Sequence, residues 1–108
     1  MPSQLVKSAQ EYDAATQEGT VVVTFFATWN GPSRQIKPFV EEQSNKKEYA
    51  NFKFVQVDAD ECPELTERED VSSMPTLKIY KNGKCIQNLA GANVNTVSEC
   101  LKKLIQAN

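Results

Sequence analysis

The chain of 108 residues contains no histidine. This absence excludes histidine as a general base, as the partner of a serine or cysteine nucleophile, and as a metal ligand. Its three cysteines, Cys62, Cys85 and Cys100, are widely spaced and form no Cys-x-x-Cys pair. They argue against a zinc site and against a disulfide framework. We therefore expect no metal, and nothing in the sequence indicates a cofactor.

Strong net charge and long hydrophobic runs are also missing. A net charge of −2 gives no reason to expect binding to nucleic acid or to a membrane surface. The longest apolar run, residues 21–27, is far too short to span a bilayer, and the first residues lack the features of a signal peptide. Because unpaired cysteines suit a reducing compartment, we expect a cytoplasmic location.

Short strand-like runs alternate with helical patterns, which predicts an α/β chain in the order βαβαβαββα. The length suits one domain, residues 1–108. Strands are predicted at residues 4–7, 21–27, 52–58, 76–80 and 84–89. Helices are predicted to begin after Ser8, near Pro32, at Pro63, and after Asn93 or Asn95.

Local signals mark the ends of several elements. Ser8 and Glu11 form a capping box, and Gly19 is expected to end the helix that they open. Pro38 predicts a kink within the second helix. The pair Asn82-Gly83 predicts a two-residue hairpin, because a type I′ turn needs positive φ at both positions. The end of the sheet should therefore be antiparallel.

The segment Phe25-Phe26-Ala27-Thr28-Trp29-Asn30-Gly31-Pro32-Ser33-Arg34 resembles the active-site stretch of the thioredoxin family. Thioredoxins carry Trp-Cys-Gly-Pro-Cys there. This chain keeps Trp29, Gly31 and Pro32 but has Asn30 and Ser33 where the family has its cysteines.

Two further motifs extend the likeness. Met74-Pro75-Thr76 resembles the cis-proline motif of the thioredoxin family, and Gly91-Ala92-Asn93 resembles the loop beside it. The resemblance covers essentially the whole chain. It implies the thioredoxin fold, an α/β fold with a mixed central sheet and helices on both faces.

The residues that would perform the family's chemistry are absent. In thioredoxins the first cysteine attacks a substrate disulfide from a helix N-terminus, and the second resolves the mixed disulfide. Asn30 has no sulfur, and the hydroxyl of Ser33 stays protonated near neutral pH. No catalytic residue is therefore assigned in this chain as written, although the family that it resembles consists of protein disulfide oxidoreductases. The plain structural interpretation is that Asn30 caps the helix and that Ser33 supports its start.

The resemblance also gives Thr24 the position of a buried aspartate that assists proton transfer. We interpret Thr24 as an ordinary strand residue whose hydroxyl finds a local partner. A person who inactivated an enzyme would replace its cysteines and have little reason to remove this acid. The loss of all three groups therefore favours natural divergence.

The resemblance implies that the docking surface of the family remains. We expect a protein partner with an extended segment, which would add as a strand beside Met74. Two alternatives stay open, since Trp29 could pack partly into the core and Pro75 could simply begin a strand. The implied partner-binding residues are Trp29, Gly31, Pro32, Met74, Pro75, Thr76, Gly91 and Ala92.

Cys62 is the candidate reactive thiol. Its place beside a helix N-terminus lowers the pKa of a thiol, while the acidic residues around it raise the pKa again. We expect an ordinary, exposed thiol there, and we expect Cys85 and Cys100 to be packing residues. Half of the acidic residues lie between Asp58 and Asp70. This acidic run is either the solvated face of a short helix or a patch that contacts a partner.

Three functions follow as hypotheses. The first is a redox-inactive protein that binds partners through the former substrate groove. The second is a thiol–disulfide oxidoreductase whose catalytic cysteines have been substituted, with thioredoxin reductase as a partner. The third is a monothiol or redox-sensing role through Cys62.

Overall fold

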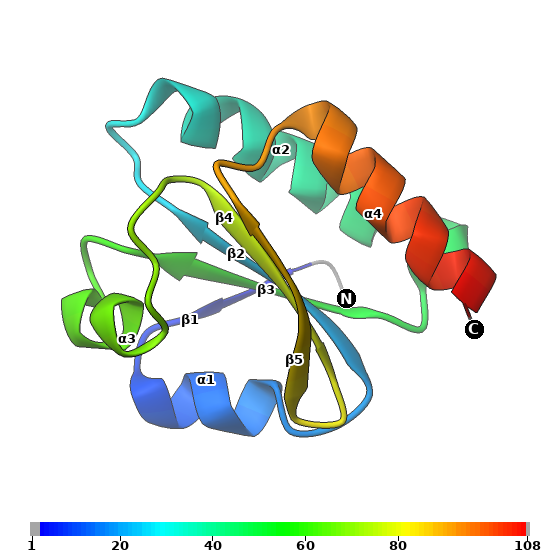
Figure 1. Cartoon of the computed structure of the whole chain (residues 1–108), viewed down its shortest axis with the longest axis horizontal. Coiled ribbons are helices and arrows are strands. Elements are labelled where there is room, and N and C mark those ends of the chain that lie inside the picture. Colours follow the sequence, from blue (N-terminus) through cyan, green and yellow to red (C-terminus); the bar gives the residue numbers. More distant parts are fainter. Residues whose placement is uncertain (1–2, 108) are drawn as a thin grey trace.

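The computed structural model describes residues 3–107, which build one mixed sheet with helices on both faces (Figure 1). The strand order is β1-β3-β2-β4-β5, with β3 parallel to β1 and β2, and β4 antiparallel to β2 and β5. The strands are β1 (Gln4–Val6), β2 (Thr20–Phe26), β3 (Lys53–Asp58), β4 (Thr76–Lys81) and β5 (Lys84–Ala90). The helices are α1 (Ala9–Ala15), α2 (Gly31–Ser44), α3 (Pro63–Arg68) and α4 (Val94–Ala107), with a short 3-10 helix at Lys47–Tyr49. The predicted fold and element order are confirmed.

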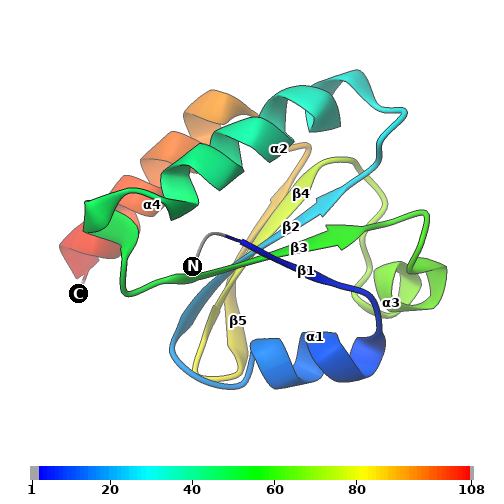
Figure 2. The ribbon, with the colours of Figure 1, turned by 180° about the vertical axis from the view of Figure 1, so that it is seen from behind.

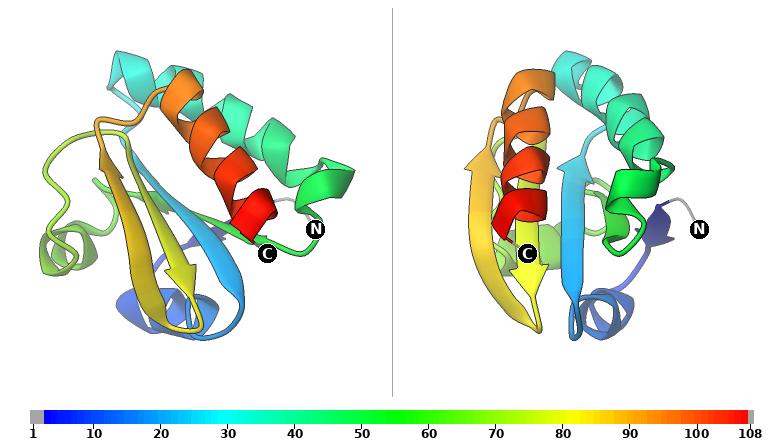
Figure 3. Two further views of the ribbon diagram at one scale, coloured as in Figure 1. Left: turned by 45° about the vertical axis from the view of Figure 1, so that its right-hand side comes forward. Right: turned by 90° about the vertical axis from the view of Figure 1, so that its right-hand side faces the viewer.

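The helices form two layers, one on each side of the sheet. Figures 1 and 2 show α1 and α3 below the sheet and α2 and α4 above it. In both views of Figure 3, α2 and α4 lie side by side along the same face. This arrangement encloses a hydrophobic core on each side.

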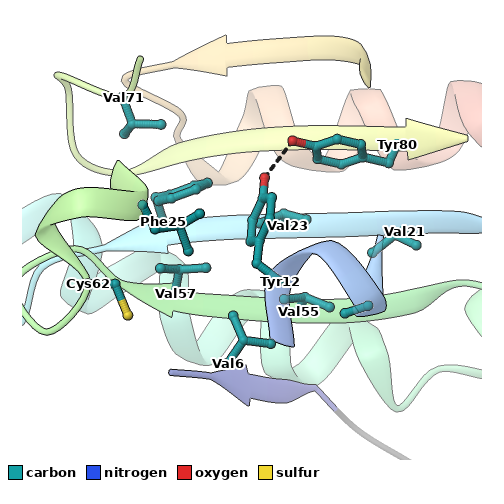
Figure 4. Close-up of a cluster of buried hydrophobic side chains, with 12 residues drawn as sticks. Val6, Tyr12, Val21, Val23, Phe25, Val55, Val57, Cys62, Val71 and Tyr80 are labelled. Carbon is teal, nitrogen blue, oxygen red and sulfur yellow. Dashed lines mark hydrogen bonds between the residues drawn. The ribbon is translucent and has the colours of Figure 1, made fainter. Parts of the chain in front are cut away.

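The two cores are divided by the alternation of side chains along the central strand β2. Val21, Val23 and Phe25 join the core beneath α1 and α3, whereas Val22 joins the core beneath α2 and α4. Every residue from 21 to 26 is buried, as expected of a strand that is covered on both faces. Figure 4 shows the core on the side of α1 and α3.

The predicted hairpin is confirmed, but the end predicted for the first helix is wrong. Asn82 and Gly83 have φ values of 50° and 87° between the antiparallel strands β4 and β5. Helix α1 ends at Ala15, and its C-cap residue Thr16 donates both its backbone N–H and its hydroxyl to the carbonyl of Tyr12. Gly19, with φ of 73°, instead forms the turn into β2, where its N–H donates to Asn82 Oδ1 at 2.9 Å.

Helix ends follow the other sequence signals closely. Ser8 Oγ accepts a hydrogen bond from the Glu11 N–H, as the capping box predicts. The Glu11 carboxylate reaches the N–H of Lys7, one residue earlier than that motif predicts. Asn93 caps α4 by accepting from the Thr96 N–H, and helix α2 continues through Pro38 to Ser44.

A polar network ties α1, α3 and β4 together on one side of the sheet. The hydroxyl groups of Tyr12 and Tyr80 are 2.6 Å apart (Figure 4). The Tyr80 hydroxyl also donates to the Glu69 carboxylate at 2.9 Å. Arg68 bridges Glu69 and Asp13, with a two-pronged contact to the Asp13 carboxylate. Burial raises the pKa of both tyrosines, so they remain protonated at physiological pH.

Within residues 3–107, no helix combines the length and the apolar character that crossing a membrane requires.

Candidate partner-binding site at the start of helix α2

Three loops meet at one end of the sheet. They are residues 27–30 after β2, residues 71–75 before β4, and residues 91–93 after β5 (Figure 1). The strand pairing brings them together, because Thr76 lies opposite both Phe25 and Ala90. The N–H of Ala92 also donates to the carbonyl of Pro75 at 2.9 Å. The sequence motifs that are far apart in the chain therefore share one surface.

Asn30 caps helix α2 as predicted. It has the extended backbone of an N-cap residue, and its Oδ1 accepts from the Ser33 N–H at 2.9 Å. Pro32 occupies the first turn, where its missing N–H leaves no unpaired donor. The amide of Asn30 thus fills the place where the first N–H groups of the helix need an acceptor.

Ser33 is buried within the first turn of α2. Only 2% of its surface is exposed, since this turn packs onto the end of β2. Its Oγ accepts a hydrogen bond from the Ala27 N–H at 3.1 Å. This bond offsets the cost of burying the hydroxyl.

Thr24 lies in the middle of β2 and is fully buried. The expectation that its hydroxyl finds a local partner is wrong for the described residues, because Thr24 Oγ1 has no hydrogen-bond partner within 3–107. The backbone groups around it serve the ladders to β3 and β4, and its neighbour in β4 is the apolar Leu77.

The site has an exposed rim over a buried frame. Trp29 is 65% exposed, so its alternative role as a partly packed core residue is wrong. Gly31, Pro32 and Gly91 are exposed and Met74 is half-buried. The frame beneath this rim consists of Pro75, Thr76 and Ala92, which are all buried.

The loop of Met74 has the backbone that the resemblance implies. The peptide bond between Met74 and Pro75 is cis. Thr76 begins β4 directly after it, and its hydroxyl donates to the Ser73 carbonyl at 2.6 Å. Pro75 therefore both precedes a strand and shapes the loop, so neither interpretation of this residue excludes the other.

Cys62 is not part of this surface. It occupies the N-cap position of α3 without a capping hydrogen bond from its side chain, and it belongs to the core of Figure 4. The expectation of an exposed thiol is wrong. Only 7% of Cys62 is exposed, because its side chain packs into the core on the side of α1 and α3. Burial raises the pKa of this thiol, and the carboxylates of Glu61, Asp58 and Glu11 raise it further.

The other two cysteines differ from each other. Cys85 is exposed on β5, so the expectation that it packs in the core is wrong. It follows the hairpin turn on β5, which is an edge strand of the sheet. Cys100 is half-buried against the core of α2 and α4, and burial raises its pKa. Among the described residues, no group of three acidic or cysteine side chains could hold a metal ion.

Part of the acidic segment lies next to the candidate site. Asp60, Glu67 and Asp70 line an open pocket of about 420 Å³, and Met74 lines the same pocket. All three carboxylates come from the segment 58–70, which contains α3. The pocket is compatible with both interpretations of the acidic run.

The cap of α2 gives a test of stability. Replacing Asn30 by alanine removes the acceptor for the Ser33 N–H and should lower the free energy of unfolding by about 1 kcal/mol. Asn30→Ser retains a capping oxygen and should lose much less in the same urea titration. Equal losses in the two variants would show that the side-chain cap contributes nothing.

The cysteines should differ in reactivity. Iodoacetamide at neutral pH should label Cys85 first and Cys62 at least about tenfold more slowly, because burial limits access and reduces the thiolate fraction of Cys62. Mass spectrometry of peptides gives each rate, and labelling in urea is the control in which the rates converge. Rapid labelling of folded Cys62 would support a monothiol role instead.

Comparison with known proteins supports the fold and identifies the family. A family model described as Thioredoxin matches residues 3–106. Thioredoxin 1 of Plasmodium falciparum is 44% identical over 100 residues, which is 92% of this chain and 94% of that protein. A solved Plasmodium falciparum thioredoxin superposes with a TM-score of 0.84 at 44% identity, covering 93% of this chain and 97% of that one. A third match is a chain from a structural study of the thiol resolving mechanism in yeast mitochondrial 1-Cys peroxiredoxin via glutathione/thioredoxin systems. It superposes with a TM-score of 0.82 at 28% identity, and the match covers 94% of each chain. The chain therefore belongs to the thioredoxin family.

Proposed function

We propose that this chain is a thioredoxin-like protein that is redox-inactive at the start of α2 and binds partner proteins through the surface around Trp29. The observation that carries the proposal is the state of Asn30 and Ser33. Both side chains accept hydrogen bonds from backbone N–H groups, and neither contains sulfur. They act as structural acceptors at the place where the family performs its chemistry.

Disulfide reduction has requirements that this site does not meet. A thiolate must attack one sulfur of the substrate, and a second thiol must then displace it, so that two thiols give up two electrons. An amide and a hydroxyl supply neither the nucleophile nor the electrons. The nearest alternative thiol in sequence, Cys62, is buried on the other face of the sheet.

The exposed rim supports partner binding. Tryptophan is enriched at the energetic centres of protein interfaces, and Trp29 has most of its surface free. Met74 lies at the same end of the sheet, on a loop that is held by the Ala92–Pro75 hydrogen bond. We infer that an extended segment of a partner protein pairs with the backbone near Met74 while its side chains contact Trp29.

The proposal also covers the class of partner, the cellular location and the cofactor requirement. One of the structural neighbours comes from work on a thioredoxin system that acts on a protein, peroxiredoxin, which supports a protein as the partner. We propose a cytoplasmic protein that acts as one domain, residues 1–108, without a cofactor.

The proposal predicts no catalysis. A Cys62→Ser variant should not accelerate the reduction of a protein disulfide by dithiothreitol above the rate of the reagent alone. Faster turnover by this variant would refute the redox-inactive assignment.

The matched control is the double substitution Asn30→Cys and Ser33→Cys in the same background. It should form a disulfide, seen as the loss of two alkylatable thiols, and should accelerate the reaction. A double variant that never oxidises would mean that positions 30 and 33 do not correspond to the family's cysteines.

Partner binding is tested separately. Trp29→Ala should weaken the affinity for a partner protein recovered on the immobilised chain by about 2 kcal/mol, roughly thirtyfold in Kd. Ile86→Ala is the control, because Ile86 is an exposed apolar side chain on β5, 45% exposed. The proposal is wrong if Ile86→Ala weakens binding and Trp29→Ala does not.

The second candidate is a thioredoxin whose catalytic cysteines have been substituted. The 44% identity to a thioredoxin across nearly the whole chain favours it, whereas the loss of the acid at Thr24 does not. Cysteine codons at positions 30 and 33 of the source gene would decide for it, with thioredoxin reductase as the partner. A monothiol role for Cys62 has weaker support, because the thiol is buried.

A further inference from the structure

Two buried oxygen atoms on neighbouring strands have no hydrogen-bond partner within residues 3–107. They are Thr24 Oγ1 on β2 and Gln56 Oε1 on β3. Thr24 is completely buried and Gln56 is 2% exposed. Nearly all buried polar groups in folded proteins are paired, so two unpaired atoms in adjacent positions need an explanation.

The two side chains lie on the same face of the sheet, next to each other. Thr24 and Gln56 are opposite residues in the parallel pair of β2 and β3. They alternate with Val23 and Val55, which face α1 and α3, so both point toward α2 and α4. The neighbour of Thr24 in β4 is Leu77, so no polar side chain adjoins it on that side.

The orientation of the Gln56 amide is fixed by its other contact. Gln56 Nε2 donates to Ser3 Oγ at 3.0 Å, and the Ser3 hydroxyl donates to the Glu41 carboxylate. Because a hydroxyl has one hydrogen, Ser3 can only accept from Gln56. The amide therefore directs its NH₂ group toward Ser3 and leaves the carbonyl oxygen as the unpaired atom.

We propose that Thr24 Oγ1 and Gln56 Oε1 together bind one internal water molecule. Gln56 Oε1 can only accept, so its ligand must donate, while the threonine hydroxyl can donate or accept. Water meets both requirements, whereas an anion would be repelled by the carbonyl oxygen. Globular proteins hold on average about one buried water per 27 residues, so about four are expected in a chain of this length.

The water would complete a polar chain through the core. The chain runs from Glu41 on α2 through Ser3 and Gln56 to the water and Thr24. It connects α2, the segment before β1, and the two central strands. Thr24 then stabilises the fold through the bound water and not through a direct hydrogen bond to another residue.

The isosteric substitution Thr24→Val tests the sign of this contribution. With the water present, valine removes one of its partners, and the unfolding equilibrium constant should rise about tenfold. With an unpaired hydroxyl, valine removes a buried polar group and should make the protein more stable. Urea denaturation separates the two results.

A second measurement identifies the water itself. Oxygen-17 relaxation dispersion counts internal waters with long residence times, and the count should fall by one in Thr24→Val. Thr16→Val is the matched control, because the Thr16 hydroxyl is buried and donates directly to the Tyr12 carbonyl at 3.0 Å. It should lose stability without losing a water.

Two outcomes would overturn the proposal. One is a Thr24→Val variant as stable as the parent or more so, which means that the hydroxyl has no partner. The other is a loss of stability with an unchanged water count, which means that Thr24 bonds directly to Gln56.

Discussion

Strand β2 is the element on which the rest of the structure depends. It pairs with β3 on one side and β4 on the other, and helices cover both of its faces. Its β-branched and aromatic residues supply both cores in alternation, which is possible only in a strand that is buried on both sides. Because β2 ends next to the start of β4, the loop that carries Trp29 and the loop that carries Met74 lie at the same end of the sheet. Thr24 is the one polar side chain in the buried part of this strand, so its environment bears on the stability of the whole sheet.

The start of α2 separates a structural requirement from a chemical one. The first N–H groups of any helix need acceptors, and the end of β2 presents one more donor, the Ala27 N–H. Asn30 and Ser33 meet both needs with oxygen atoms, so the fold does not require sulfur at either position. A member of the thioredoxin family can therefore keep the geometry of this site with oxygen acceptors at both positions. This separation explains how a chain with 44% identity to a thioredoxin can lack both cysteines.

Features that depend on neighbouring residues in the sequence could be predicted, and those that depend on packing could not. The Asn82-Gly83 hairpin and the Asn30 cap were predictable, because each is decided by the chemistry of a few adjacent residues. The burial of Ser33 and Cys62 was not, because it depends on how α2 and α3 dock onto the sheet. The lack of a protein partner for the Thr24 hydroxyl within residues 3–107 could not be predicted for a similar reason, since it depends on the register of β2 against β3 and β4.

The division of the site into a rim and a frame has a consequence for specificity. Pro75, Thr76 and Ala92 are buried and joined by strand pairing and by the Ala92–Pro75 hydrogen bond, so changes there would disturb the sheet. The exposed side chain of Trp29 makes no comparable contribution to the core and can change at little cost in stability. A partner that pairs with the backbone beside Met74 would be held by the frame, whichever sequence it carries. Under the proposed function, selection among partners would come from the rim, where Trp29 is 65% exposed.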